Sequence, residues 1–132
     1  MELLNSKLVN KIEYPVKVLQ FGEGNFLRGF VDWMINKANN KDQFKGSVRI
    51  VQPLENGLVN LLNNQDGLYT LISQGLQKGE VVREKEIISC IEKGVNPYTD
   101  YNNYIESAKI PELRFIISNT TEAGIAYNPG EK

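Results

Sequence analysis

The sequence of 132 residues contains no histidine and a single cysteine, Cys90. Without histidine, this chain supplies neither a histidine general base nor a histidine metal ligand. One cysteine cannot form an internal disulfide, which fits a reducing compartment. Cys90 lies in the apolar run EIISCI, and this setting predicts a buried structural thiol rather than a nucleophile. The sequence shows no cluster of metal-ligating residues, so we expect no metal.

Neither sign of charge dominates, and long hydrophobic runs are missing. Fifteen basic residues oppose 16 acidic ones, for a net charge of -1. A nucleic-acid partner requires a basic face, so none is expected. No apolar run approaches the ~20 residues of a membrane span. The N-terminal stretch MELLNSKLVNKIEYPVKV lacks the basic and then apolar order of a secretory signal, and we therefore expect a cytoplasmic protein with no membrane partner.

The order of the first periodic segments predicts an α/β domain. Val16–Phe21 is a β-rich run that ends in a glycine, and a buried strand is the natural interpretation. The helical period from Asn25 to about Asn39 begins at a plausible N-cap, Asn25. Ser47–Gln52 is a second strand, stopped by Pro53. These two strands should be parallel neighbours with a right-handed crossover. The apolar stripe expected on one face of the helix contains Phe26, Phe30, Trp33 and Met34.

The remaining segments predict an unfinished parallel sheet with an inserted hairpin. Leu68–Gln74 and Glu80–Ile91 are two β runs joined by GLQKG. A helix is expected from Asn96-Pro97 to about Lys109, and Leu113–Ser118 is a third core strand. Three core strands are fewer than the five or six of a doubly wound domain, so residues 1–132 are interpreted as an incomplete N-terminal Rossmann-like domain. Two weaker segments are Leu3–Ile12, a short helix or ordered arm, and Asn56–Asn64, a short helix or loop.

The stretch LQFGEGNFLRGF contains the glycines of a possible phosphate-binding turn. Gly22 allows a sharp turn after the strand, and Gly24 lets backbone approach a pyrophosphate without a Cβ in the way. The helix that opens at Asn25 points its free N–H groups and positive dipole end at the phosphate. Gly29 is expected to let the helix pack closely on the strand. A generic turn is the alternative, but the strand before it and the helix after it favour nucleotide binding.

Arg28 is unexpected in the first turn of a helix, where a cation opposes the dipole. One explanation is an ion pair with Asp32 four residues later, worth about 0.3–0.5 kcal/mol. The other is that the guanidinium reaches a cofactor phosphate or a substrate carboxylate. The sequence leaves both explanations open.

Two further loops are candidates for cofactor contacts at the carboxyl ends of strands. Gln52 stands where a typical NAD site has an acidic ribose reader, and no arginine follows to attract a 2′-phosphate. NAD is thereby mildly favoured over NADP. After the third core strand, short polar side chains are placed to line the nicotinamide half: Asn119, Thr120, Thr121 and Glu122. An ordinary turn is the alternative for this loop.

Four segments together resemble the long-chain mannitol dehydrogenase family: QFGEGNFLRGF, LYTLISQGLQKGEVVREKEIISCI, NPYTDY and LRFIISNTTEAGI. The family's turn, G-x-G-x-F-x-R-G or -R-A, is met here by Gly22, Gly24, Phe26, Arg28 and Gly29. The resemblance covers nearly the whole chain from about position 16. NTTEAGI and GLQKGEVV resemble more narrowly the branch that acts on tagaturonate.

The resemblance implies an NAD-dependent oxidoreductase that interconverts tagaturonate and altronate by hydride transfer in hexuronate catabolism. It implies no metal. It also implies a second, mostly helical domain, absent from residues 1–132, which carries a catalytic lysine with asparagine and histidine partners. This chain alone is therefore expected to bind dinucleotide but not to turn over the sugar acid. Two alternatives stay open: a family member acting on fructuronate or mannitol, and a nucleotide-sensing or interaction module without a catalytic domain.

Overall fold

The computed structural model describes residues 11–119 and 129–130. Its main sheet has four parallel strands in the order β5-β2-β1-β6. These are β1 (Val16–Phe21), β2 (Ser47–Val51), β5 (Ile91–Val95) and β6 (Phe115–Ser118). The chain runs outward from β1 to β2 and β5 and then returns to β6 on the other side of β1. This reversal is the switch point at which doubly wound folds bind ligands. The predicted α/β class and the parallel pairing of β1 with β2 are confirmed.

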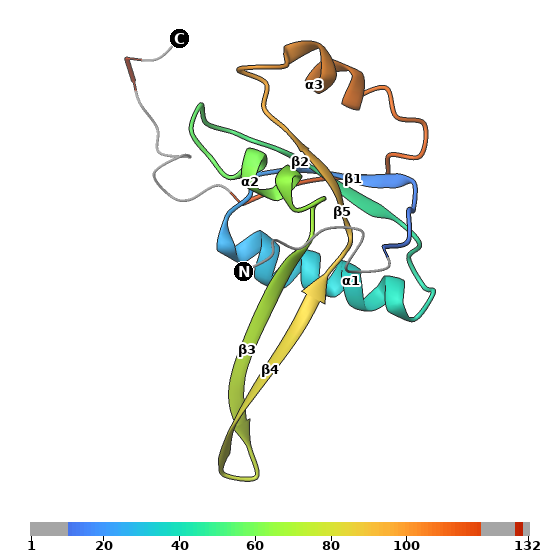
Figure 1. Cartoon of the computed structure of the whole chain (residues 1–132). Helices are drawn as coiled ribbons and strands as arrows, with labels where there is room; N and C mark the ends of the chain where they lie inside the picture. The colour runs from blue at the N-terminus through green and yellow to red at the C-terminus, as the bar shows by residue number, and fades with distance from the viewer. Residues whose placement is uncertain (1–10, 120–128, 131–132) are drawn as a thin grey trace.

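Helices cover both faces of the main sheet. Figure 1 shows α1 (Asp32–Asn40) below it and α3 (Tyr101–Ser107) above it. A π-helical turn, η1 (Leu27–Val31), precedes α1 and continues into it. The expected helix is therefore confirmed, but its first turns are wider than an α-helix. The short helix α2 (Val59–Asn64) lies within the segment for which helix and loop were both open.

The inserted hairpin is confirmed and is longer than expected. It joins β3 (Tyr69–Gln77) to β4 (Glu80–Ile88) through Lys78 and Gly79, both with positive φ. Positive φ at both central residues is typical of the type I′ turn, whose twist matches paired strands. The first strand thus continues through Gly75-Leu76-Gln77, which the sequence had placed in the connection. Figure 1 shows this hairpin projecting away from the main sheet.

The prediction of one strand over Glu80–Ile91 is wrong, because the run contains all of β4 and the first residue of β5. Ser89 and Cys90 separate them, and β5 leaves the hairpin to pair with β2. The fourth core strand was therefore missed. Its sequence, IEKGV, carries two charges and a glycine, a weak β signal. Gly94 is needed there because a Cβ would lie 2.7 Å from a methyl of Val59 on α2.

The start of α3 also differs from the prediction. The helix does not begin at Asn96-Pro97; the side chain of Asp100 caps it by accepting from the Asn103 N–H at 3.2 Å. Asn96 instead forms a turn of its own, because its side-chain oxygen accepts from the Tyr98 N–H at 3.0 Å. An Asx turn of this kind competes with a helical start.

The apolar stripe predicted for the first helix does not form its inner face. Phe26, Phe30 and Met34 are 56%, 50% and 44% exposed, and of that stripe only Trp33 packs against the core. The buried positions of the helix are one leucine and three polar residues: Leu27, Asp32, Asn36 and Asn39. The core itself lies between the sheet, α2 and the root of the hairpin, and contains Val18, Val48, Ile50, Val59, Leu62, Tyr69, Ile88, Cys90 and Ile91. The predicted burial of Cys90 is confirmed.

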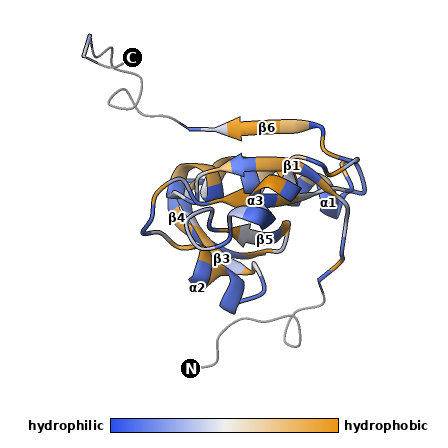
Figure 2. Cartoon of the chain, turned by 90° about the horizontal axis from the view of Figure 1, so that it is seen from above, coloured by the Kyte–Doolittle hydropathy of each residue, from blue (hydrophilic) through white to orange (hydrophobic). Residues whose placement is uncertain are grey.

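One edge of the sheet carries exposed apolar side chains. Phe115 and Ile116 of β6 are 54% and 67% exposed, and Figure 2 shows this strand as an apolar outer edge. Among residues 11–119 no strand pairs with that outer edge. The Leu3–Ile12 prediction lies outside the described residues except for Lys11 and Ile12, which are not helical. No helix of the described part is long and apolar enough to cross a membrane.

Candidate functional site

The carboxyl ends of three neighbouring strands bring the candidate loops together. The glycine turn follows β1, the Gln52 loop follows β2, and Asn119 follows β6. In the register of β1 with β6, Phe21 lies beside Ser118, so Gly22 and Asn119 leave adjacent strand ends. Neighbouring strands lie about 4.8 Å apart. The glycine turn therefore occupies the middle of this edge, between the other two loops.

The glycine turn has one position that demands glycine and one that stands open. Gly22 has φ +130°, a conformation that side chains rarely adopt, and its N–H donates to the Val51 carbonyl at 3.0 Å. A Cβ on Gly24 would meet nothing within 4 Å. The turn thus leaves space beside its backbone at the position where the sequence required close approach of a ligand.

The prediction that Gly29 lets the helix pack closely on the strand is wrong. A Cβ there would meet Leu71 of β3 at 3.7 Å, which is ordinary van der Waals contact. The hairpin, and not strand β1, is thus the neighbour of this glycine. Gly29 is not required for close helix–strand packing.

Asn25 and Phe26 stand at the exposed entrance to the helix. The Asn25 side-chain oxygen accepts from the Arg28 guanidinium at 3.1 Å, and no side-chain cap bond is formed at the start of η1. The Arg28 N–H donates to the Gly24 carbonyl at 3.1 Å. N–H groups in the first turn of a helix precede any intrahelical partner and remain available to a ligand. Phe26 contacts Phe30, with ring centroids 5.4 Å apart, and does not enter the core.

Arg28 is held by the turn and not by a carboxylate. Its Nε donates to the Glu23 carbonyl at 2.7 Å, and its guanidinium lies 5.5 Å from the ring centre of Tyr69. The Arg28–Asp32 ion pair considered above is absent from the described residues, where Arg28 forms no salt bridge. A guanidinium has five N–H donors, and two of them make these side-chain bonds. Within the described part of the chain no acceptor binds the remaining donors, which leaves them and the positive charge for an anion beside the glycine turn.

Gln52 is buried and its amide is used inside its own loop. Nε2 donates to the carbonyls of Leu54 and Glu55 at 2.8 and 3.0 Å, while Oε1 accepts from the Val59 N–H at 3.2 Å. Gln52 therefore shapes the loop and the start of α2, and it is not presented to a ligand. The acidic group near this strand end comes instead from Glu23. A Cβ built on Gly57 would lie 2.5 Å from Glu23 Oε1 and 2.6 Å from Gln52 Cδ, so the Glu23 carboxylate and the Gln52 side chain lie close together beside Gly57.

Sequence reasoning missed a buried pair beneath the turn. Gln20 of β1 and Asp32 of α1 are both fully buried, and the amide Nε2 donates to the carboxylate Oδ2 at 3.1 Å. Burial raises the pKa of Asp32 to about 7, although the Gln20 hydrogen bond and the Arg28 charge both oppose this shift. The sequence feature that could have revealed this pair is the glutamine inside the apolar strand VKVLQF.

Of the last candidate loop, only Asn119 is described, and it is exposed at the end of β6. Thr120, Thr121 and Glu122 lie outside the described residues. The described part of the chain contains no group of three histidine, cysteine, aspartate or glutamate residues placed to hold a metal.

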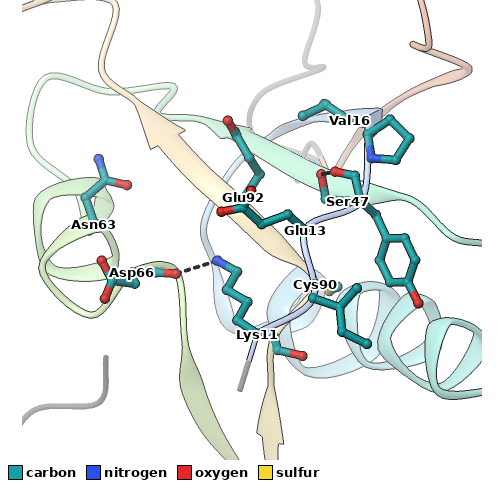
Figure 3. Close-up of a pocket in the computed structure, with 12 residues that line it drawn as sticks. Lys11, Glu13, Val16, Ser47, Asn63, Asp66, Cys90 and Glu92 are labelled. Atoms are coloured by element: carbon teal, nitrogen blue, oxygen red, sulfur yellow. Dashed lines mark hydrogen bonds between the residues drawn. The ribbon is translucent and has the colours of Figure 1, made fainter. Parts of the chain in front are cut away.

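A cavity of about 520 Å³ lies at the other edge of the sheet, where strands begin (Figure 3). Val16 and Ser47, which open β1 and β2, line it together with Lys11, Cys90 and Glu92. The Lys11 ammonium donates to the carbonyls of Asp66 and Ile91, and burial lowers its pKa. Lys11 thus anchors the chain before β1, on the side of the sheet away from the glycine turn.

Comparison with known proteins identifies relatives over almost the whole chain. The Rossmann domain model of mannitol dehydrogenase matches residues 16–130. Altronate oxidoreductase of Bacteroides thetaiotaomicron is 50% identical over 129 residues, which are 98% of this chain and 27% of that protein. Altronate oxidoreductase of Bacillus subtilis is 52% identical over 133 residues, 100% of this chain and 28% of that protein. The chain thus spans little more than a quarter of the length of these curated relatives.

Solved structures share the fold at low sequence identity. Mannitol 2-dehydrogenase of Pseudomonas fluorescens, in a ternary complex with NAD and D-mannitol, matches with a TM-score of 0.78 at 20% identity. That match covers 93% of this chain and 27% of the other. A D-sorbitol dehydrogenase in substrate-free form matches with a TM-score of 0.77 at 16% identity, over 98% of this chain and 29% of the other.

Proposed function

The chain belongs to the mannitol dehydrogenase family as its Rossmann domain, and we propose that it is the NAD-binding part of an oxidoreductase interconverting tagaturonate and altronate. Relatives named altronate oxidoreductase, at 43 to 52% identity, support this substrate pair over mannitol. The reaction belongs to hexuronate catabolism, and we propose a cytoplasmic setting for it.

One observation carries the proposal: Arg28, which forms no salt bridge with any described residue, lies beside an open glycine turn at the switch point of the sheet. The dinucleotide pyrophosphate would lie beside Gly22 and Gly24, where no Cβ obstructs it. The helix start at Asn25 and Phe26 adds N–H donors and its positive dipole end. The Arg28 guanidinium, fixed by Glu23 and Asn25, adds a full charge. Asn119 and the segment Thr120–Glu122 would line the nicotinamide half.

Glu23 supports NAD over NADP. A ribose reader at the end of β2 normally rejects a 2′-phosphate by its negative charge. Gln52 carries no charge, but the Glu23 carboxylate reaches the same strand end beside Gly57. Substitution Glu23→Gln is therefore expected to narrow the preference for NADH over NADPH, measured as the ratio of the two dissociation constants. An unchanged ratio would assign the preference to other groups.

The bound cofactor supplies the hydride, and this chain binds and orients it. The residues that complete catalysis are proposed to lie in a further domain of a longer protein, because the chain spans 27 to 28% of its relatives. Two exposed apolar surfaces support such a domain. One is formed by Phe26, Phe30 and Met34, and the other by Phe115 and Ile116 of β6. Exposed apolar groups of this kind are typical of surfaces that another domain covers.

Calorimetric titration of the 132-residue chain with NADH tests the binding step, and Arg28→Met is the informative variant. Loss of one charge-assisted phosphate contact is expected to weaken binding by about 1.5–3 kcal/mol. Lys37→Met, which removes an exposed cation on α1, is the matched control and should leave binding unchanged. Turnover of NADH with tagaturonate by the 132-residue chain alone would contradict the proposal that the catalytic residues lie in a further domain.

A further inference from the structure

The buried pair beneath the glycine turn connects three elements through one amide group. Gln20 Nε2 donates to the Asp32 carboxylate at 3.1 Å and to the Gly22 carbonyl at 3.0 Å. Gln20 belongs to β1, Asp32 begins α1, and Gly22 begins the turn between them. A change in the charge of the Asp32 carboxyl group therefore alters the hydrogen bonding of the Gly22 carbonyl through the Gln20 side chain alone.

Resting on the proposed function, we propose that Asp32 is a positioning residue for the dinucleotide site: it fixes the glycine turn through Gln20 and takes up a proton when the dinucleotide binds. Neither residue is exposed, so neither would touch the ligand.

The pair is short of a proton donor when Asp32 is ionised. Asp32 Oδ1 and Gln20 Oε1 are both buried and have no hydrogen-bond partner among the described residues. Both are acceptors, and a carboxylate adds no donor. A neutral carboxyl group carries an O–H, which gives the pair the donor that it lacks. Because unpaired buried polar atoms are costly, the neutral form of Asp32 suits this environment better than the ionised form.

The groups facing Asp32 leave its charge poorly compensated. Arg28 of η1 favours the carboxylate at a distance, without forming an ion pair. Tyr69 of β3 and Cys90, just before β5, are the other titratable groups that face it, and Asp32 contributes to raising the pKa of each. The Cys90 thiol donates to the backbone carbonyl of Asp32 at 3.2 Å, not to its carboxylate. Burial dominates, and the carboxyl group changes its charge close to neutral pH.

A dinucleotide at the turn would move this equilibrium toward the neutral form. The pyrophosphate carries two negative charges and would engage Arg28, the one cation within residues 11–119 that favours the Asp32 carboxylate. Both effects raise the proton affinity of Asp32, so binding takes up a proton. By linkage, affinity for the dinucleotide is constant below about pH 7 and falls above it, by at most about tenfold per pH unit.

The first test uses the ligand-free chain and follows carboxyl carbons and backbone amides by NMR as pH is raised. Asp32 is expected to titrate near neutral pH, and the amides of Gly22 and Glu23 should shift with the same midpoint. Asp32→Asn should abolish that shift, whereas Asp42→Asn, at an exposed aspartate, should preserve it. Titration of Asp32 near its ordinary pKa, or glycine amides that ignore it, would overturn the positioning role.

The second test measures NADH affinity by calorimetry at about pH 6.5 and about pH 8.5, in buffers of different ionisation enthalpy. Wild-type chain and Asp42→Asn should bind at least about threefold more weakly at the higher pH and take up protons on binding. Asp32→Asn should show neither effect. Equal pH dependence in all three chains would overturn the proton uptake. No NADH binding by any of them would overturn the proposed function and the uptake, leaving the ligand-free titration to decide the positioning role.

Discussion

Two alanine substitutions in the glycine turn separate stability from binding. Gly22 has φ +130°, and a Cβ there would lie 3.3 Å from a methyl of Leu27. A side chain in such a conformation costs about 1–3 kcal/mol, and the close contact adds to that cost. Gly24 has an ordinary φ and open space around it, so alanine should fit the free chain. Gly24→Ala should leave stability unchanged or raise it by up to about 1 kcal/mol.

Thermal unfolding measures this difference directly. From the usual entropy of unfolding per residue, 1 kcal/mol corresponds to about 3.6 °C for a chain of this size. Gly22→Ala should therefore lower the Tm by about 4–11 °C, and Gly24→Ala should not lower it. NADH affinity should show the reverse distinction, because the Gly24 methyl fills the space assigned to the pyrophosphate while the fold stays intact. A stable Gly24→Ala chain with wild-type NADH affinity would refute the placement of the phosphate, and a Gly22→Ala chain of wild-type stability would refute the strained turn.

Three further predictions concern the stability of the fold. Glu86 accepts from the indole N–H of Trp33 at 2.7 Å, so Glu86→Ala should lower stability by about 1–2 kcal/mol and shift the emission of this single tryptophan to longer wavelength. Gly94→Ala should destabilise the chain by about 1–3 kcal/mol in urea unfolding, because its Cβ would contact Val59, and Val59→Ala in the same chain should recover part of the loss. The unfolded chain ionises Asp32 near pH 3.8 and the folded chain near pH 7, so the native state binds more protons between these values and stability falls as pH rises through them, by at most about 4 kcal/mol. Urea unfolding of Asp32→Asn should lack that fall and match or exceed wild type at pH 8.

Local signals carried most of the correct predictions. Strand β1, the turn and the following helix each depend on residues that are adjacent in the sequence, so their order could be predicted from periodicity and glycine spacing. Strand β5 could not, because IEKGV becomes a strand through pairing with β2 and not through its own propensity. The prediction of which residues form the inner face of α1 was wrong for a related reason. Asn36 is buried because it accepts from the Ser89 N–H at 3.0 Å, and Asn39 because it bonds Gly46 in both directions.

The candidate site divides in the same way. Gly22 lies in the turn after β1 and Arg28 in η1, and short-range hydrogen bonds hold Arg28 against the turn, so the motif spacing was enough to predict that the two lie together. The Arg28–Asp32 pair failed because the helix turns Asp32 inward, onto Gln20, while Arg28 bonds back to the loop. Gln52 was interpreted as a ligand contact but has its hydrogen bonds satisfied by its own loop. Which way a polar side chain turns depends on partners that the spacing of a motif does not specify.

Binding of a dinucleotide pyrophosphate at the glycine turn can be observed residue by residue in a proton–nitrogen correlation spectrum of the chain, titrated with NADH and then with NADPH. We expect dispersed peaks, with shifts under NADH at the glycine turn and helix start and smaller shifts under NADPH; the reporting amides are Gly22, Gly24, Asn25 and Arg28. Dispersed peaks that do not move, or that move instead around Lys11 at the opposite edge of the sheet, would contradict binding of the pyrophosphate at the glycine turn.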